Sequence, residues 1–116
     1  MKHIPLYLAV TASIVVVLYY FSGPEPRYCD KPFAGSDNTV VMFSTRWCPY
    51  CKKARRLFVN NQVAFCEYDV GASSENQELF TELGGSGVPL ILIGQETFYG
   101  FSEVGIKQSL IRNGFL

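Results

Sequence analysis

The sequence has 116 residues, which is enough for one small domain and a short appendage. Its 10 Lys and Arg residues balance 10 Asp and Glu residues, and a formal net charge of zero gives no indication of a nucleic-acid partner. The four cysteines are too few and too unevenly spaced for a disulfide scaffold. Cys29 and Cys66 also do not supply the second ligand pair that a zinc site requires, so we expect no metal site.

Residues 1–22 form a candidate membrane anchor. The run from Ile4 to Phe21 carries no charge, and crossing a bilayer takes roughly 17 to 25 apolar residues. The alternative is an uncleaved signal sequence with Lys2 as its basic end, although no A-x-A-like cleavage site follows. The aromatic cluster at 19–21 resembles an interfacial belt, which favours an anchor. The positive-inside rule, applied to the few flanking cations, gives only a slight preference for a cytoplasmic domain.

Residues 23–37 are expected to form an extended linker, because Gly23, Pro24 and Pro26 stop the apolar helix. Cys29 lies in this linker. Its simplest interpretation is an exposed thiol, and the alternative is a regulatory or intermolecular disulfide. The globular domain is then expected over residues 38–116.

The domain shows alternating strand and helix patterns. Strands are predicted over 39–44, 63–70, 88–93 and 97–99, and Cys66 in the second of them is interpreted as a small core residue. Helices are predicted over 49–60, from 73 to about 83, and from Ser102, which acts as a cap, to just before Gly114. Ser74 and Gln77 fit a capping box. The order β-α-β-α-β-β-α predicts an α/β fold, with a four-stranded mixed sheet flanked by three helices.

The first domain helix is expected to have an apolar face and a cationic face. Cys51, Ala54, Leu57 and Phe58 recur at helical spacing. The cationic residues occupy the remaining positions: Lys52, Lys53, Arg55 and Arg56. We expect a solvated face that also favours an anionic ligand or thiolate.

Two cysteines separated by two residues begin this helix. Cys48 precedes it, where unpaired backbone N–H groups and the helix dipole stabilise a thiolate. Pro49 falls at the first helical position, where its missing N–H does no harm. Cys51 presents its sulfur one turn later. This arrangement is typical of a redox-active pair.

Three motifs together resemble the glutaredoxin branch of the thioredoxin superfamily over about residues 39–116. They are Cys48-Pro49-Tyr50-Cys51, the dithiol signature; Gly87-Val88-Pro89, at the place of the cis-proline loop; and Tyr99-Gly100-Phe101-Ser102-Glu103, at the place of the glycine-rich turn. The resemblance implies a thioredoxin-like fold and glutathione as a cosubstrate, with no tightly bound cofactor. The implied binding residues are Arg46, Tyr50, Val88, Pro89, Gly100, Phe101, Ser102 and Glu103.

Some positions depart from the family's pattern. Thr45 stands where many glutaredoxins have lysine, and Arg46 beside it is expected to supply the positive charge. Tyr99 replaces a glycine of the turn, and Ser102 replaces an acidic residue. Trp47 before the pair is a thioredoxin-like feature.

The resulting hypothesis is a thiol–disulfide oxidoreductase. Cys48 is expected to attack a protein disulfide or a protein–glutathione mixed disulfide, and Cys51 is expected to resolve the former. One alternative is a membrane-tethered oxidant or isomerase that faces an oxidising compartment. Another is a module that binds a [2Fe–2S] cluster through the first cysteine and glutathione.

Overall fold

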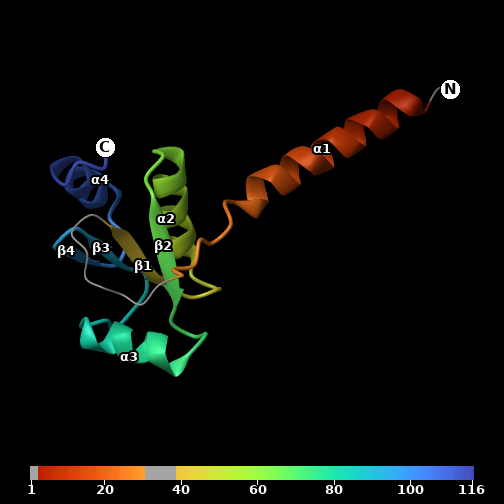
Figure 1. Cartoon of the computed structure of the whole chain (residues 1–116). Helices are drawn as coiled ribbons and strands as arrows, with labels where there is room; N and C mark the ends of the chain where they lie inside the picture. The colour runs from red at the N-terminus through yellow and green to blue at the C-terminus, as the bar shows by residue number, and fades with distance from the viewer. Residues whose placement is uncertain (1–2, 31–38) are drawn as a thin grey trace.

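A computed structural model describes residues 3–30 and 39–116 of the chain (Figure 1). The elements follow in the order α1 (Ile4–Ser22), β1 (Val40–Ser44), α2 (Pro49–Asn60), β2 (Phe65–Asp69), α3 (Ser74–Glu82), β3 (Leu90–Ile93), β4 (Glu96–Tyr99) and α4 (Glu103–Arg112). The four-stranded sheet has the order β2-β1-β3-β4. β1 is parallel to β2 and antiparallel to β3, and β4 is antiparallel to β3. This is the predicted mixed sheet with three helices on its faces.

The sheet separates two hydrophobic clusters. Because successive strand side chains point to opposite faces, Val40 and Met42 of β1 join the cluster that also contains residues of α2 and α4. Val41 and Phe43 join the cluster that contains Phe80 of α3. β1 is buried along its whole length, which explains why its sequence is continuously apolar instead of alternating.

The helix ends agree closely with the sequence prediction. α2 covers the predicted residues, and Ser102 caps α4 as expected. The cap of α3 differs, because Ser73 and not Ser74 occupies the N-cap position. Its side chain accepts a hydrogen bond from the Asn76 backbone N–H at 3.1 Å.

One predicted member of the cationic face of α2 is buried. Arg55 points into the domain and pairs with Glu67 of β2 through two hydrogen bonds of 2.7 Å. The hydroxyl of Ser44 donates a third hydrogen bond to Glu67 Oε1 at 2.9 Å. The prediction of a solvated Arg55 was therefore wrong, because helical periodicity carries no information about a partner on another element.

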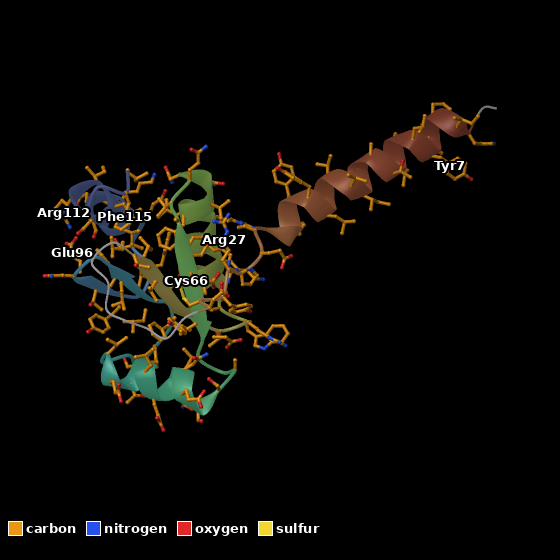
Figure 2. All side chains as sticks on the ribbon, in the orientation of Figure 1. Tyr7, Arg27, Cys66, Glu96, Arg112 and Phe115 are labelled. Carbon is orange, nitrogen blue, oxygen red and sulfur yellow. A yellow bond between two sulfur atoms is a disulfide. The ribbon has the colours of Figure 1, made fainter. Side chains whose placement is uncertain are left out.

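The interpretation of Cys29 as an exposed thiol is wrong. Cys66 packs against a hydrophobic cluster, as its interpretation as a small core residue requires, but it is not a free thiol. The two cysteines form a disulfide that ties the segment before the domain to β2. Backbone hydrogen bonds support the same attachment, because Glu67 N–H donates to the Arg27 carbonyl at 2.7 Å and Cys29 N–H donates to the Glu67 carbonyl at 2.9 Å. Arg27 and Cys66 lie near one another in Figure 2, where the segment passes β2. The remainder of the predicted linker, residues 31–37, and the predicted first residue of the domain, Asn38, lie outside the described residues.

α1 projects away from the domain as an isolated helix (Figure 1). Its stretch Ile4–Phe21 has a mean hydropathy of 2.0 and buries none of its residues against the rest of the protein. Tyr7, which is labelled in Figure 2, points outward from it. By length and composition this helix can cross a membrane, and a signal sequence has the same properties.

Candidate active site

The candidate redox pair lies at the N-terminus of α2. Cys48 occupies the N-cap position in an extended conformation, and Pro49 begins the helix. The two cysteines form a disulfide, and Cys48 Sγ accepts a hydrogen bond from the Cys51 backbone N–H at 3.0 Å. That N–H is one of the donors that a helix leaves unpaired at its start, so it stabilises negative charge on Sγ. Cys51 is fully buried, whereas Cys48 keeps 8 % of its surface exposed, which makes Cys48 the more accessible sulfur.

Two loops converge on this pair. The Val88–Pro89 peptide bond is cis, as the resemblance implied. The Gly100 N–H donates to the Pro89 carbonyl at 2.9 Å, which joins this loop to the turn before α4. The ring of Phe101 in that turn stacks on Tyr50 of the cysteine motif, with centroids 6.5 Å apart and planes 28° apart. Each of the three predicted motifs therefore contacts at least one of the others.

The side chains of Val88 and Phe101 also pack against the hydrophobic cluster that contains both cysteines. Gly100 has φ of 104°, a left-handed conformation that favours glycine, so the turn depends on this residue. Ser102 then caps α4 by accepting a hydrogen bond from the Gly105 N–H at 3.3 Å. Glu103, the first residue of the helix, pairs with Lys107 at 3.2 Å on the surface.

Arg46 lies beside the pair in a pocket that the sequence did not predict. The pocket has a volume of about 360 Å³. It is lined by Thr45, Arg46 and Lys52 together with four residues of the segment before the domain, namely Pro24, Glu25, Pro26 and Tyr28. Residues from the predicted linker therefore share a pocket with Arg46 and Lys52, which flank the cysteine motif in the sequence.

The contribution of residues 24–28 to this pocket depends on the disulfide between Cys29 and Cys66. No signal in the sequence indicated it, because the two cysteines are 37 positions apart and nothing in their local patterns indicates a contact. The disulfide and the active pair lie on opposite faces of the sheet. Cys29 and Cys66 pack against the cluster with Phe80, and Cys48 and Cys51 belong to the cluster of α2 and α4. The two disulfides are therefore separate features.

Within residues 3–30 and 39–116, no group of three or more His, Cys, Asp and Glu side chains is arranged to hold a metal ion. The fold and the cysteine geometry together define a redox protein of the thioredoxin-like class. In this class a helix N-terminus lowers the pKa of the thiol that attacks disulfides.

Comparison with known proteins supports assignment to this class and identifies the family within it. A sequence model of the glutaredoxin family matches residues 40–98. A glutaredoxin of Pseudomonas aeruginosa is 39 % identical over 66 residues, which cover 56 % of this chain and 79 % of the relative. Glutaredoxin-C4 of Arabidopsis thaliana is 38 % identical over 53 residues, which cover 46 % of this chain and 38 % of the relative.

Solved structures agree on the fold. A buckwheat glutaredoxin–glutathione complex superimposes with a TM-score of 0.56 and 22 % identity, covering 71 % of this chain and 84 % of the other. The glutaredoxin-like NrdH-redoxin of Escherichia coli gives a TM-score of 0.56 and 20 % identity, covering 60 % of this chain and 92 % of the other. The chain belongs to the glutaredoxin family and is a thiol–disulfide oxidoreductase.

Proposed function

We propose that the protein is a membrane-anchored, glutathione-linked oxidoreductase that uses Cys48 and Cys51. The observation that carries this proposal is the convergence of Tyr50, the Val88–Pro89 loop and Phe101 around the more accessible sulfur. An extended peptide such as glutathione can pair with the backbone of the Val88–Pro89 loop. The start of α4 at Ser102 and Glu103 offers N–H groups to a carboxylate. Arg46, two residues before Cys48, supplies positive charge for an anionic ligand or the Cys48 thiolate.

The chemistry follows from this arrangement. The Cys48 thiolate attacks the glutathione sulfur of a mixed disulfide, and the substrate protein leaves as a thiolate that takes up a proton. A second glutathione thiolate then attacks the sulfur bound to Cys48, which releases oxidised glutathione and restores the Cys48 thiolate. With a protein disulfide, Cys51 attacks Cys48 instead, which releases the reduced substrate and leaves the Cys48–Cys51 disulfide that the structure contains.

Cysteine variants of the full chain test the proposal. Cys48→Ser is expected to abolish both the reduction of protein disulfides and the removal of glutathione from proteins. Cys51→Ser is expected to lose only the reduction of protein disulfides, because glutathione resolves the other intermediate. A Cys29→Ser/Cys66→Ser variant is the matched control and is expected to keep both reactions. Residual turnover by Cys48→Ser would refute the assignment.

A second candidate function, a tethered oxidant or isomerase, is favoured by the Cys29–Cys66 disulfide. Disulfides persist in oxidising compartments and are rare where glutathione and thioredoxin keep thiols reduced. A domain stabilised by this bond suits the oxidising side of the membrane. The charges that flank α1, in contrast, slightly favour a cytoplasmic domain. On that side the Cys48–Cys51 disulfide would accept electrons from substrate thiols instead of donating them.

Thiol trapping in intact cells separates these two functions. In a Cys48→Ser/Cys51→Ser variant, Cys29 and Cys66 are the only cysteines left of the four. If the domain faces an oxidising compartment, acid-quenched cells yield protein that binds a thiol reagent only after reduction. If it faces a reducing compartment, the Cys29 and Cys66 thiols both react without prior reduction. That result would support the reductase function over the oxidant function.

A further inference from the structure

The tether between α1 and the domain is short and stiff. α1 ends at Ser22, and the chain is held to β2 from Arg27 onward by hydrogen bonds and by the Cys29–Cys66 disulfide. At about 3.5 Å per residue the intervening segment spans less than ~20 Å. Pro24 and Pro26 restrict it further, because each fixes φ. The domain therefore cannot move far from the end of α1.

This tether reaches the domain on the side of α2 and the cysteine motif. Pro24 and Glu25 share a pocket with Arg46 and Lys52. A Cβ placed on Gly23 would lie 3.5 Å from the guanidinium of Arg56, so the end of α1 is next to the second turn of α2. Figure 1 shows the same arrangement, with the chain from α1 passing α2 before it reaches β2.

The surface that faces this end of α1 is basic. The basic face consists of Lys52, Lys53 and Arg56, which are exposed on a helix that contains no acidic residue. In the described part of the chain none of the three forms an ion pair, in contrast to Arg55, Lys107 and Arg112. Lys53 lies 5.1 Å above the ring of Tyr50 in a cation–π contact, and it has no acidic partner among the described residues. These cations are positioned for an anionic surface.

Aromatic side chains lie at the same end of the helix. Trp47 is 88 % exposed and directly precedes Cys48, and Tyr50 is also exposed. Tryptophan, tyrosine, lysine and arginine are the residues that populate membrane interfaces. At this exposure most of the Trp47 ring is available for contact with a partner or an interface.

We propose that the basic face docks on the anionic headgroups of the membrane that α1 enters, with Trp47 at the interface. Each Lys or Arg near an anionic leaflet favours contact about five-fold, and the short tether keeps the cations within reach of it. Cys48 is thereby held close to the bilayer surface. The inference rests on the membrane anchor of the proposed function and adds an orientation that the anchor alone does not require.

Trp47 provides the test, because it is the only tryptophan of the chain. The full-length protein is reconstituted into vesicles of phosphatidylcholine and phosphatidylglycerol whose acyl chains carry bromine near the headgroup. Docking predicts that the bromine quenches Trp47 emission. Quenching is expected to decrease in high salt and in vesicles of phosphatidylcholine alone, because both weaken the attraction of the cations.

A pair of variants with equal charge change isolates the basic face. Lys53→Gln/Arg56→Gln lowers the net charge by two and is expected to weaken docking roughly thirty-fold, with loss of most quenching. Ser74→Glu/Gln77→Glu makes the same charge change on α3, which lies on the opposite face of the sheet. In this control variant the emission of Trp47 is expected to be quenched as strongly as in the unaltered protein. Circular dichroism confirms that both variants are folded.

The failures of the two proposals are distinguishable. If the protein floats with the vesicles but Trp47 is not quenched, the domain stands off the surface and this inference is wrong while the anchor holds. Equal quenching in both variants would likewise contradict the role of the basic face. If the protein does not float with the vesicles, the anchor itself is wrong, and the docking inference is refuted with it. Disulfide reductase activity in detergent is independent of all three outcomes.

Discussion

Arg55 and Glu67 form a buried, bidentate ion pair that joins α2 to β2. The side chains are 8 % and 0 % exposed, and the hydrogen bond to Glu67 raises the pKa of Arg55. Glu67 also accepts hydrogen bonds from the Ser44 hydroxyl and, at 3.4 Å, from the Arg27 backbone N–H. One carboxylate therefore connects β1, β2, α2 and the segment that leads from α1. It lies directly after Cys66, so the ion pair and the disulfide stabilise the same junction.

Removal of one partner of this pair should destabilise the domain strongly. Arg55→Met leaves the Glu67 carboxylate buried without its cation, which typically costs about 3–5 kcal/mol. We expect chemical denaturation of the chain in detergent to show this loss. Arg55→Met/Glu67→Leu removes both charges and should recover much of it, because no unpaired charge remains. If the single and double variants are equally unstable, the pair stabilises the fold through the packing of its side chains and not through its charges.

Loss of the Cys29–Cys66 disulfide should also destabilise the fold. For a bond that closes a loop between residues 37 positions apart, the chain-entropy model gives about 3–4 kcal/mol. Cys29→Ser/Cys66→Ser is expected to lose this amount in denaturant unfolding. A strong reductant should lower the stability of a Cys48→Ser/Cys51→Ser protein by the same amount and leave a variant in which all four cysteines are replaced by serine unaffected. A reductant effect in the latter would show that another group is responsible.

The sequence predicted local features well and long-range pairs poorly. The start of α2 was predictable because Cys48 and Pro49 are suited to the N-cap and first helical positions. The buried Arg55 was not, because a cation among other cations on a helix reads as part of a solvated face. Glu67 was the available signal: a charged residue in the middle of an apolar strand must be paired if it is buried.

The three active-site motifs were predictable from the sequence, in contrast to the Arg55–Glu67 pair. Each of them marks a backbone feature that is local in sequence, namely a helix start, a cis-proline loop and a glycine turn. The resemblance to the family then indicated that the three meet. The pocket residues between Pro24 and Tyr28 lie outside the part that resembles the family, so neither local pattern nor resemblance indicated that they share a pocket with Arg46.

The interaction of Glu96 with α4 predicts a pH dependence of stability. A hydrogen bond from Ser109, followed by one from Arg112 at 2.6 Å, lowers the pKa of Glu96 below its ordinary value of 4.5 (Figure 2). A carboxyl whose pKa is lower in the folded state stabilises the fold above the unfolded pKa. That contribution is lost as the pH falls from about 4.5 through the folded value.

We therefore expect the thermal midpoint to decrease as the pH is lowered through this window. Glu96→Gln should have a shallower decrease and a lower midpoint at neutral pH, measured by circular dichroism at constant ionic strength. Glu75→Gln, which alters an exposed carboxylate on α3, is the control and should keep the slope of the unaltered protein. Identical slopes for all three proteins would mean that Glu96 does not titrate in this window.

The stacking of Phe101 on Tyr50 should matter for glutathione. Aromatic pairs contribute about 0.5–1.5 kcal/mol beyond the area they bury, so Phe101→Ala is expected to raise KM for glutathione roughly two- to ten-fold. Phe101→Leu keeps the apolar volume and should show a smaller effect. Steady-state kinetics with a glutathionylated peptide measures both. A reduced kcat with unchanged KM would instead indicate that the ring acts on the position of the cysteine pair.

The proposed position of Cys48 near the bilayer predicts a preference among substrates. Two single-span peptides are compared in the same vesicles, one with a glutathionylated cysteine directly outside the span and one with it at the end of a long flexible arm. A sulfur confined to the surface meets Cys48 at a higher effective concentration, so the first peptide should be reduced roughly ten-fold faster. In detergent, where both partners are released from a common surface, the two rates should become equal. If the long-armed peptide is reduced as fast in vesicles, Cys48 is not confined to the surface, because a domain free of the membrane reaches both sulfurs alike.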